Sequence, residues 1–160
     1  MSCALTRCHG HVIPLVSRGW ARGASGDTDQ GIASIDDGIR DYRATGSILA
    51  TPCWLVLKAE ALYLANRTSE ALAAIADAEA VAQRTEEREC FAELHRLRGI
   101  FLTAIGAEVT KIETSFGEAI RIAKKQKSVS LQKRAEATYA EYRRQKASGS
   151  GGRGFRLPLG

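Results

Sequence analysis

The 160-residue sequence predicts an all-α fold in which the helices form consecutive hairpins. Ala, Leu, Glu and Arg, which favour helix, are abundant, whereas three prolines and four phenylalanines are few for a β-sandwich. Apolar residues recur at three- and four-residue spacing, as on the buried face of an amphipathic helix. Small residues and helix-ending residues also return about every 40 positions, which indicates an internal repeat.

Two series of residues define this repeat. The first series consists of small residues in the middle of an apolar helical pattern: Gly19, Ala59 and Gly99. The second series consists of residues at which such a pattern stops: Gly26, Asn66 and Gly106. Gly and Asn tolerate the left-handed backbone conformation found at helix ends. Each residue of the second series therefore marks the turn of a helical hairpin.

Three helix–turn–helix units follow from these landmarks, and a seventh helix begins a fourth unit. The expected helices cover residues 12–25, 29–45, 52–65, 69–85, 87–105, 110–127 and 129–146. The second helices share two further sets of equivalent residues: Ile35, Ile75 and Phe116, and Gly38, Ala78 and Ala119. A single hairpin cannot bury its apolar face, so we expect neighbouring units to stack on one another.

Local signals support several of these helix ends. Thr51 precedes Pro52, which predicts an N-cap followed by proline in the first helical position. Thr110 and Glu113 have the spacing of a capping box at the start of another helix. Gly46 is expected to end the helix of 29–45.

The hairpin pattern resembles the tetratricopeptide repeat, with a small residue in the first helix, a turn Gly, and "EA" opening the second helix. The stretches "GIASIDDGIRDYRATGS" and "AELHRLRGIFL" are similar to the C-terminal arrays of bacterial regulators. In those proteins an adenylate/guanylate cyclase module or a MalT-like transcription activator module, with an AAA-type ATPase module, precedes the repeats. The resemblance covers roughly 15–146 and implies a right-handed α-solenoid of about three repeats plus one extra helix. No cyclase motif or GxxxxGK[ST] motif is present.

The sequence divides into three parts of different character. We expect residues 1–11 to be poorly ordered, residues 12–146 to form the repeat domain, and residues 147–160 to be a flexible Gly/Ser-rich basic tail. The net charge of +5 is uneven, because eleven basic and two acidic residues from 121 onward give +9 and the first 120 residues carry −4. Four scattered cysteines, no signal-peptide core and no membrane-spanning run favour a reduced, cytoplasmic protein.

Two clusters of reactive side chains are weighed against structural roles. Cys90, Glu93 and His95 lie in "CFAELHRLRGIFLTAIG", but the five-residue spacing of Cys90 and His95 places them on poorly matched faces of a helix. We therefore expect a packing helix rather than a catalytic site. A second cluster lies near the N-terminus and lacks the second close ligand pair that a structural zinc site needs: Cys3, Cys8, His9 and His11. No catalytic residue, cofactor or metal is expected.

The first helices of such arrays line a concave face, which is where partners usually bind. Positions equivalent under the repeat predict a groove that contains Trp20, Glu60, Tyr63 and Arg96. Trp, Tyr and Arg are enriched at interface hot spots. The structural alternative is that Trp20 and Tyr63 fill gaps between hairpins.

The expected function is that of a non-enzymatic protein-interaction or scaffold module, as a regulatory or sensor part of a bacterial signalling system. A second copy of the chain is a further candidate partner, at the exposed end of the array. The alternative is binding of nucleic acid or an acidic surface by the basic segment from residue 121, in which Tyr139 and Tyr142 are interleaved. More often such a segment is the solvated side of a terminal helix.

Overall fold

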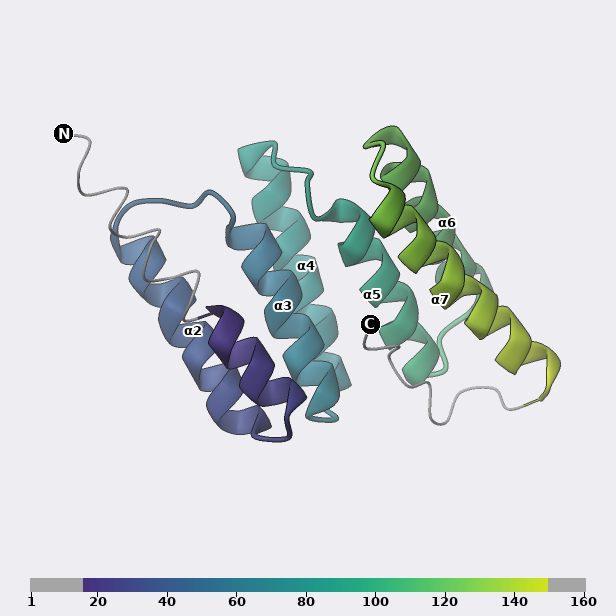
Figure 1. Cartoon of the computed structure of the whole chain (residues 1–160), viewed down its shortest axis with the longest axis horizontal. Coiled ribbons are helices and arrows are strands. Elements are labelled where there is room, and N and C mark those ends of the chain that lie inside the picture. The colour runs from purple at the N-terminus through teal and green to yellow at the C-terminus, as the bar shows by residue number, and fades with distance from the viewer. Residues whose placement is uncertain (1–15, 150–160) are drawn as a thin grey trace. The chain divides into compact units, whose positions relative to one another are not determined.

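The computed structural model describes residues 16–149, and all regular secondary structure in this range is α-helical (Figure 1). The chain divides into two compact units, with the boundary between Arg88 and Glu89. The all-α prediction is therefore confirmed for the described range. The predicted N-terminal segment and most of the predicted tail lie outside it.

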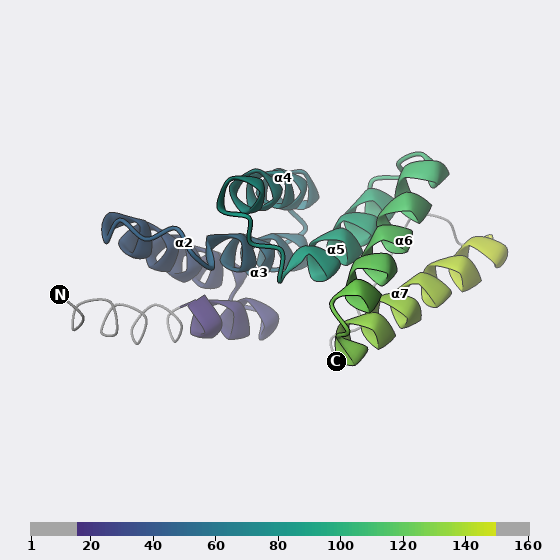
Figure 2. The same ribbon diagram turned by 90° about the horizontal axis from the view of Figure 1, so that it is seen from above.

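The first unit contains a helix over residues 16–24, followed by α2 (Thr28–Ala44), α3 (Thr51–Leu64) and α4 (Thr68–Thr85). Consecutive helices run antiparallel, and α3 packs against both α2 and α4 (Figure 1). Seen from above, α3 lies between the helix of 16–24 and α4 (Figure 2). The largest buried side chains of the unit include Tyr42, which meets the Trp54 ring edge-on at 4.4 Å between centroids.

The second unit contains α5 (Phe91–Ala104), α6 (Val109–Lys125) and α7 (Val129–Ala147). Helix α5 packs against both α6 and α7, and α6 packs against α7. Phe116 is fully buried, and its ring lies 5.4 Å from the Tyr139 ring and 5.5 Å from the Tyr142 ring. This aromatic cluster forms the centre of the packing between α6 and α7.

The small residues of the repeat lie where two helices approach closely. A Cβ atom on Gly19 would stand 2.9 Å from Cγ1 of Ile35, and one on Gly99 would stand 2.7 Å from the Phe116 ring. Ala59 is fully buried, as are the three equivalent residues of the second helices: Ile35, Ile75 and Phe116. The same pair of repeat positions therefore forms a close contact in each unit.

The predicted turn residues have left-handed backbone angles. Gly26, Asn66 and Gly106 have φ of 106°, 60° and 67°, and Gly46 after α2 has φ of 81°. Gly adopts such left-handed angles without steric cost, and Asn adopts them more readily than most other residues. Helix ends therefore lie within two residues of their predicted positions at these turns.

The start of α5 differs from its prediction. The helix begins at Phe91 rather than at residue 87, because Glu86 has a φ of 59° and ends α4. Glu87 lies outside the helix, and its Oε2 accepts a hydrogen bond of 2.8 Å from the backbone N–H of Ala50, in the loop before α3. Charged residues in this connection carry no periodicity that separates a loop from a first helical turn.

Neither predicted N-cap acts as one. Helix α3 begins at Thr51 itself, Ala50 takes the N-cap position, and Thr51 Oγ1 is buried without a hydrogen-bond partner. The capping box at Thr110 is also wrong, because α6 begins one residue earlier, after Glu108. The Thr110 hydroxyl instead donates to the Glu108 carboxylate. The N-cap residues of α2 to α7 form no side-chain cap hydrogen bond.

Candidate functional site

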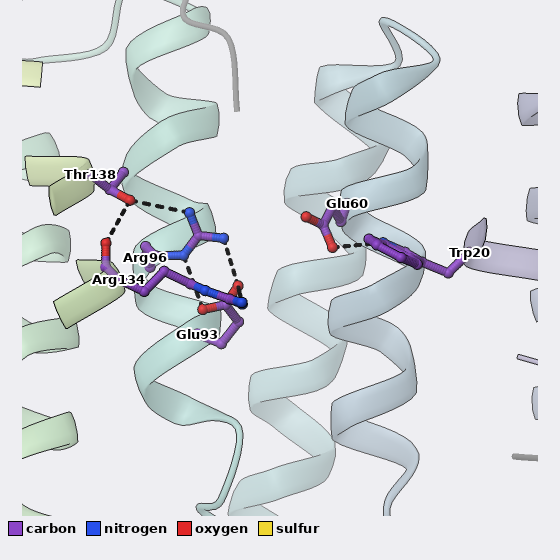
Figure 3. Close-up of polar contacts among 6 residues, drawn as sticks. All are labelled: Trp20, Glu60, Glu93, Arg96, Arg134 and Thr138. Atoms are coloured by element: carbon purple, nitrogen blue, oxygen red, sulfur yellow. Dashed lines mark hydrogen bonds and ion pairs between the residues drawn. The ribbon is translucent and has the colours of Figure 1, made fainter. Parts of the chain in front are cut away.

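Trp20 and Glu60 are brought together in the first unit, as the repeat alignment predicts. Trp20 Nε1–H donates to Glu60 Oε2 at 2.7 Å, and both side chains are half-buried (Figure 3). Each residue directly follows a small repeat residue, Gly19 in one case and Ala59 in the other. The helix of 16–24 also packs against α3, since a Cβ atom on Gly23 would stand 3.6 Å from Cβ of Ala61.

Tyr63 lies near this contact on α3. It follows Glu60 by three residues, so the two side chains share one side of the helix. Tyr63 is half-buried, and burial raises the pKa of its hydroxyl above the ordinary value because the phenolate is poorly solvated there. We call Trp20, Glu60 and Tyr63 the Trp20 surface.

Arg96, the fourth residue of the predicted groove, is 2% exposed and lies in the second unit. Its Nε and Nη2 donate to the two carboxylate oxygens of Glu93 at 3.0 and 2.6 Å, and its Nη1 donates to Thr138 Oγ1 at 3.3 Å (Figure 3). The Thr138 hydroxyl in turn donates to the backbone carbonyl of Arg134 at 2.8 Å. Arg96 therefore joins α5 to α7 inside the unit, and its burial removes it from the groove.

The clustered side chains before and within α5 are engaged in packing and ion pairs. Glu93 accepts from Arg96 and also lies 3.5 Å from Nη1 of Arg134. His95 meets the Phe91 ring edge-on at 6.2 Å between centroids. Cys90 stands before the first residue of the helix, at its N-cap position. This arrangement fits the expected packing helix.

No group of three or more His, Cys, Asp and Glu side chains in residues 16–149 has the geometry to hold a metal ion. The candidate ligands Cys3, Cys8, His9 and His11 lie outside the described residues. Within the same range, every helix is too short or too polar to cross a membrane.

A charged cleft of about 350 Å³ lies in the first unit, between α2, α3 and α4. Three cations and two carboxylates line it: Arg43, Lys58, Arg84, Asp36 and Asp77. Lys58 Nζ is 2.6 Å from Asp36 Oδ1. Arg43, Arg84 and Asp77 are exposed and form no ion pair with any residue of the described range. We call this site the Arg43–Arg84 cleft.

The sequence interpretation missed this cleft, although a signal for it exists. Asp36 precedes Arg43 by seven residues, and Asp77 precedes Arg84 by the same spacing. Seven residues are two helical turns, so each acid and base lie on one face of their helix. Only the packing of three helices shows that these faces line the same space.

The basic helix α7 is largely tied into its own unit. Lys146 pairs with Glu113 at 3.1 Å, Arg144 pairs with Glu141, and the Arg143 guanidinium lies 5.7 Å from the Tyr139 ring centroid. Tyr139 and Tyr142 are not free stacking sites, because both pack against Phe116.

A small apolar pocket of about 180 Å³ lies where the turn after α5 meets α6 and α7. Its lining includes Ile112 and Tyr142, and also Val109, which is 43% exposed.

No protein-family model matches the chain, and no solved structure matches it. Over 127 residues the chain is 27% identical to a protein of Rhizobium meliloti (strain 1021) named "Uncharacterized protein R02095". The aligned region is 79% of this chain and 12% of that protein. The chain thus spans about an eighth of the length of this relative.

Proposed function

We propose that this chain is a non-enzymatic protein-interaction module. The observation that carries the proposal is the hydrogen bond of 2.7 Å between Trp20 and Glu60. It joins side chains 40 residues apart in sequence and leaves both half-exposed beside Tyr63. Large aromatic side chains on a fixed helical frame lose little conformational entropy when a partner covers them.

The finer assignment to a tetratricopeptide-like α-solenoid is part of this proposal. Close contacts at equivalent positions, Gly19 with Ile35 and Gly99 with Phe116, support it. The left-handed turn residues at intervals of 40 support it as well. A match to a small part of a much longer protein is typical of a module that occurs within larger proteins. The resemblance of the sequence to the repeat arrays of bacterial regulators is the basis on which we propose a regulatory or sensor role in bacterial cytoplasmic signalling.

The partner would be a protein or peptide that covers the Trp20 surface. Glu60 accepts the indole N–H of Trp20, which fixes the orientation of the aromatic ring that a partner would cover. Nucleic-acid binding by the basic end is the less favoured function, because two cations of α7, Lys146 and Arg144, pair with Glu113 and Glu141, and Arg134 pairs with Glu93. The affinity of a partner bound at the Trp20 surface through apolar contacts and hydrogen bonds would fall less with added salt than an affinity that depends on phosphate contacts.

Affinity capture with the full-length chain tests this proposal. The bait would be compared with Trp20→Ala and Tyr63→Ala, and with the control Lys111→Ala, which changes an exposed side chain of the second unit. Proteins captured by wild type and the control should fall about tenfold with each surface variant, as for a hot-spot truncation. Equal recovery by all four chains, with unchanged circular dichroism, would overturn the proposal.

A further inference from the structure

We propose that the Arg43–Arg84 cleft binds an acidic segment of a protein partner. The cleft is separate from the Trp20 surface. Lys58 in the cleft and Glu60 in the Trp20 surface are two residues apart on α3, and such residues point to different sides of a helix. In agreement, the helix of 16–24 and α4 flank α3 on opposite sides (Figure 2).

Arg43 and Arg84 are the cations available to an incoming anion. Lys58 is neutralised by Asp36 at 2.6 Å, whereas the two arginines are exposed and form no ion pair within residues 16–149. They come from different helices, α2 and α4, and line the same space. The dipole of each helix favours a cation in its last turn, which explains one arginine per helix. It does not explain why both line a single cleft.

The pairing of an acidic residue with a basic residue seven positions later recurs in three helices. Asp36, Asp77 and Glu118 are spaced 41 residues apart, and so are Arg43, Arg84 and Lys125. In α6, Glu118 pairs with Arg121 at 2.7 Å. Lys125 is not among the residues that line the cleft. Lys125 therefore provides a matched control, because it has the same repeat position and exposure as Arg84 without the cleft.

The lining of the cleft selects a peptide rather than a nucleic acid. Arginine binds carboxylates through two parallel N–H donors, so Arg43 and Arg84 fit acidic side chains. Asp77 has no partner in the described range and suits an N–H or a basic side chain of the same peptide. A continuous phosphate backbone would instead be repelled by Asp77.

The cleft also has an apolar floor. Ile39, Leu55 and Val81 contribute to its lining and are buried. A volume of about 350 Å³ accommodates a few side chains, as peptide and small-ligand pockets do. The preferred segment therefore carries acidic residues with an apolar residue between them.

Fluorescence anisotropy with a synthetic peptide tests this inference. The probe is a labelled short peptide of alternating Glu and Leu with one central Lys, and the reference peptide has Gln in place of Glu. The full chain should bind the acidic probe saturably and the Gln peptide far more weakly. Arg43→Gln and Arg84→Gln should each weaken binding of the acidic probe about tenfold, as loss of a charge-assisted contact does. Lys125→Gln should leave it unchanged.

Several outcomes would overturn the inference. One is that the acidic probe does not bind, and another is that Lys125→Gln weakens binding as much as the two arginine variants do. A third is that a single-stranded DNA oligonucleotide binds more tightly with the same dependence on Arg43 and Arg84. Because both arginines are exposed and form no ion pair with the described part of the chain, the variants should retain the wild-type thermal melt. Tyr63→Ala should bind the acidic probe normally, so failure at the Trp20 surface is separable from failure at this cleft.

Discussion

The two units use arginine in opposite ways. Arg96 in the second unit is 2% exposed, and its guanidinium bonds to Glu93 and Thr138. Arg43 and Arg84 in the first unit are exposed and line an open cleft without an ion pair in the described range. The comparison teaches that an arginine indicates a binding site only when its donors are not already used. In the second unit the charge stabilises the fold, and in the first it is available to a partner.

The largest expected effect comes from breaking the Arg96 network. Arg96→Ala leaves Glu93 without its bidentate partner in a mostly buried setting and opens a cavity between α5 and α7. We expect the free energy of unfolding to fall by about 3 kcal/mol, measured by urea denaturation. The control Arg121→Ala removes an exposed pair of the same spacing in α6 and should hardly change the midpoint. Similar losses in both variants would contradict the structural role of Arg96.

The next effect comes from the close contact between α5 and α6. Gly99→Ala places a methyl group 2.7 Å from the buried Phe116 ring, which is held by Tyr139 and Tyr142. We expect a loss of about 2 kcal/mol from overpacking. Gly117→Ala, whose methyl group meets nothing within 4 Å, should raise stability by about 0.5–1 kcal/mol through helix propensity. Thermal melts of the two variants should therefore shift in opposite directions, and a stabilised Gly99→Ala would refute the contact.

A smaller effect is expected in the first unit. Trp20→Phe keeps most of the apolar ring and removes the N–H that Glu60 accepts. The half-buried carboxylate can then turn to water, so the loss should be about 1 kcal/mol. Chemical denaturation followed by circular dichroism measures it. A loss equal to that of Arg96→Ala would show that Trp20 acts as core rather than as a surface residue.

The smallest expected effect is on the stability of the fold at low pH. Hydrogen bonds from Arg67 and from Arg121 lower the pKa of Glu70 and of Glu118 below their ordinary values. A carboxyl group with a lowered pKa in the folded state stabilises the fold above its unfolded pKa, and this contribution is lost as the pH falls through the folded value. Stability should therefore decline below about pH 4.5. Glu70→Gln and Glu118→Gln should each make this decline slightly shallower in melts recorded across that range.

The turns and the close contacts could be predicted because they depend on single residues. Gly and Asn take the φ of 60° to 106° seen at Gly26, Asn66 and Gly106 more readily than other residues do, so their positions predict these turns. Ala50 and Glu86 take similar angles, and their residue types gave no such signal. Gly99 likewise indicates a close contact between helices, since even a Cβ atom at this position would stand 2.7 Å from the Phe116 ring.

The starts of helices and the role of Arg96 could not be predicted in the same way. Residues 87–90 are polar and have no periodicity, so the pattern does not distinguish a loop from a helical turn. Glu93 three residues before Arg96 was the available signal for an internal ion pair, but only packing against Thr138 buries it. The Arg43–Arg84 cleft depends on three helices at once, and no single segment of sequence contains it.

The most direct test of the contrast between the units is an amide NMR titration of the full chain with the acidic peptide. We predict shifts at residues that line the Arg43–Arg84 cleft, such as Ile39, Ala80 and Val81, and no shifts along α7. Arg84→Gln should suppress them. Shifts concentrated on α7, or shifts that persist in Arg84→Gln, would contradict the assignment of the binding cations to the first unit.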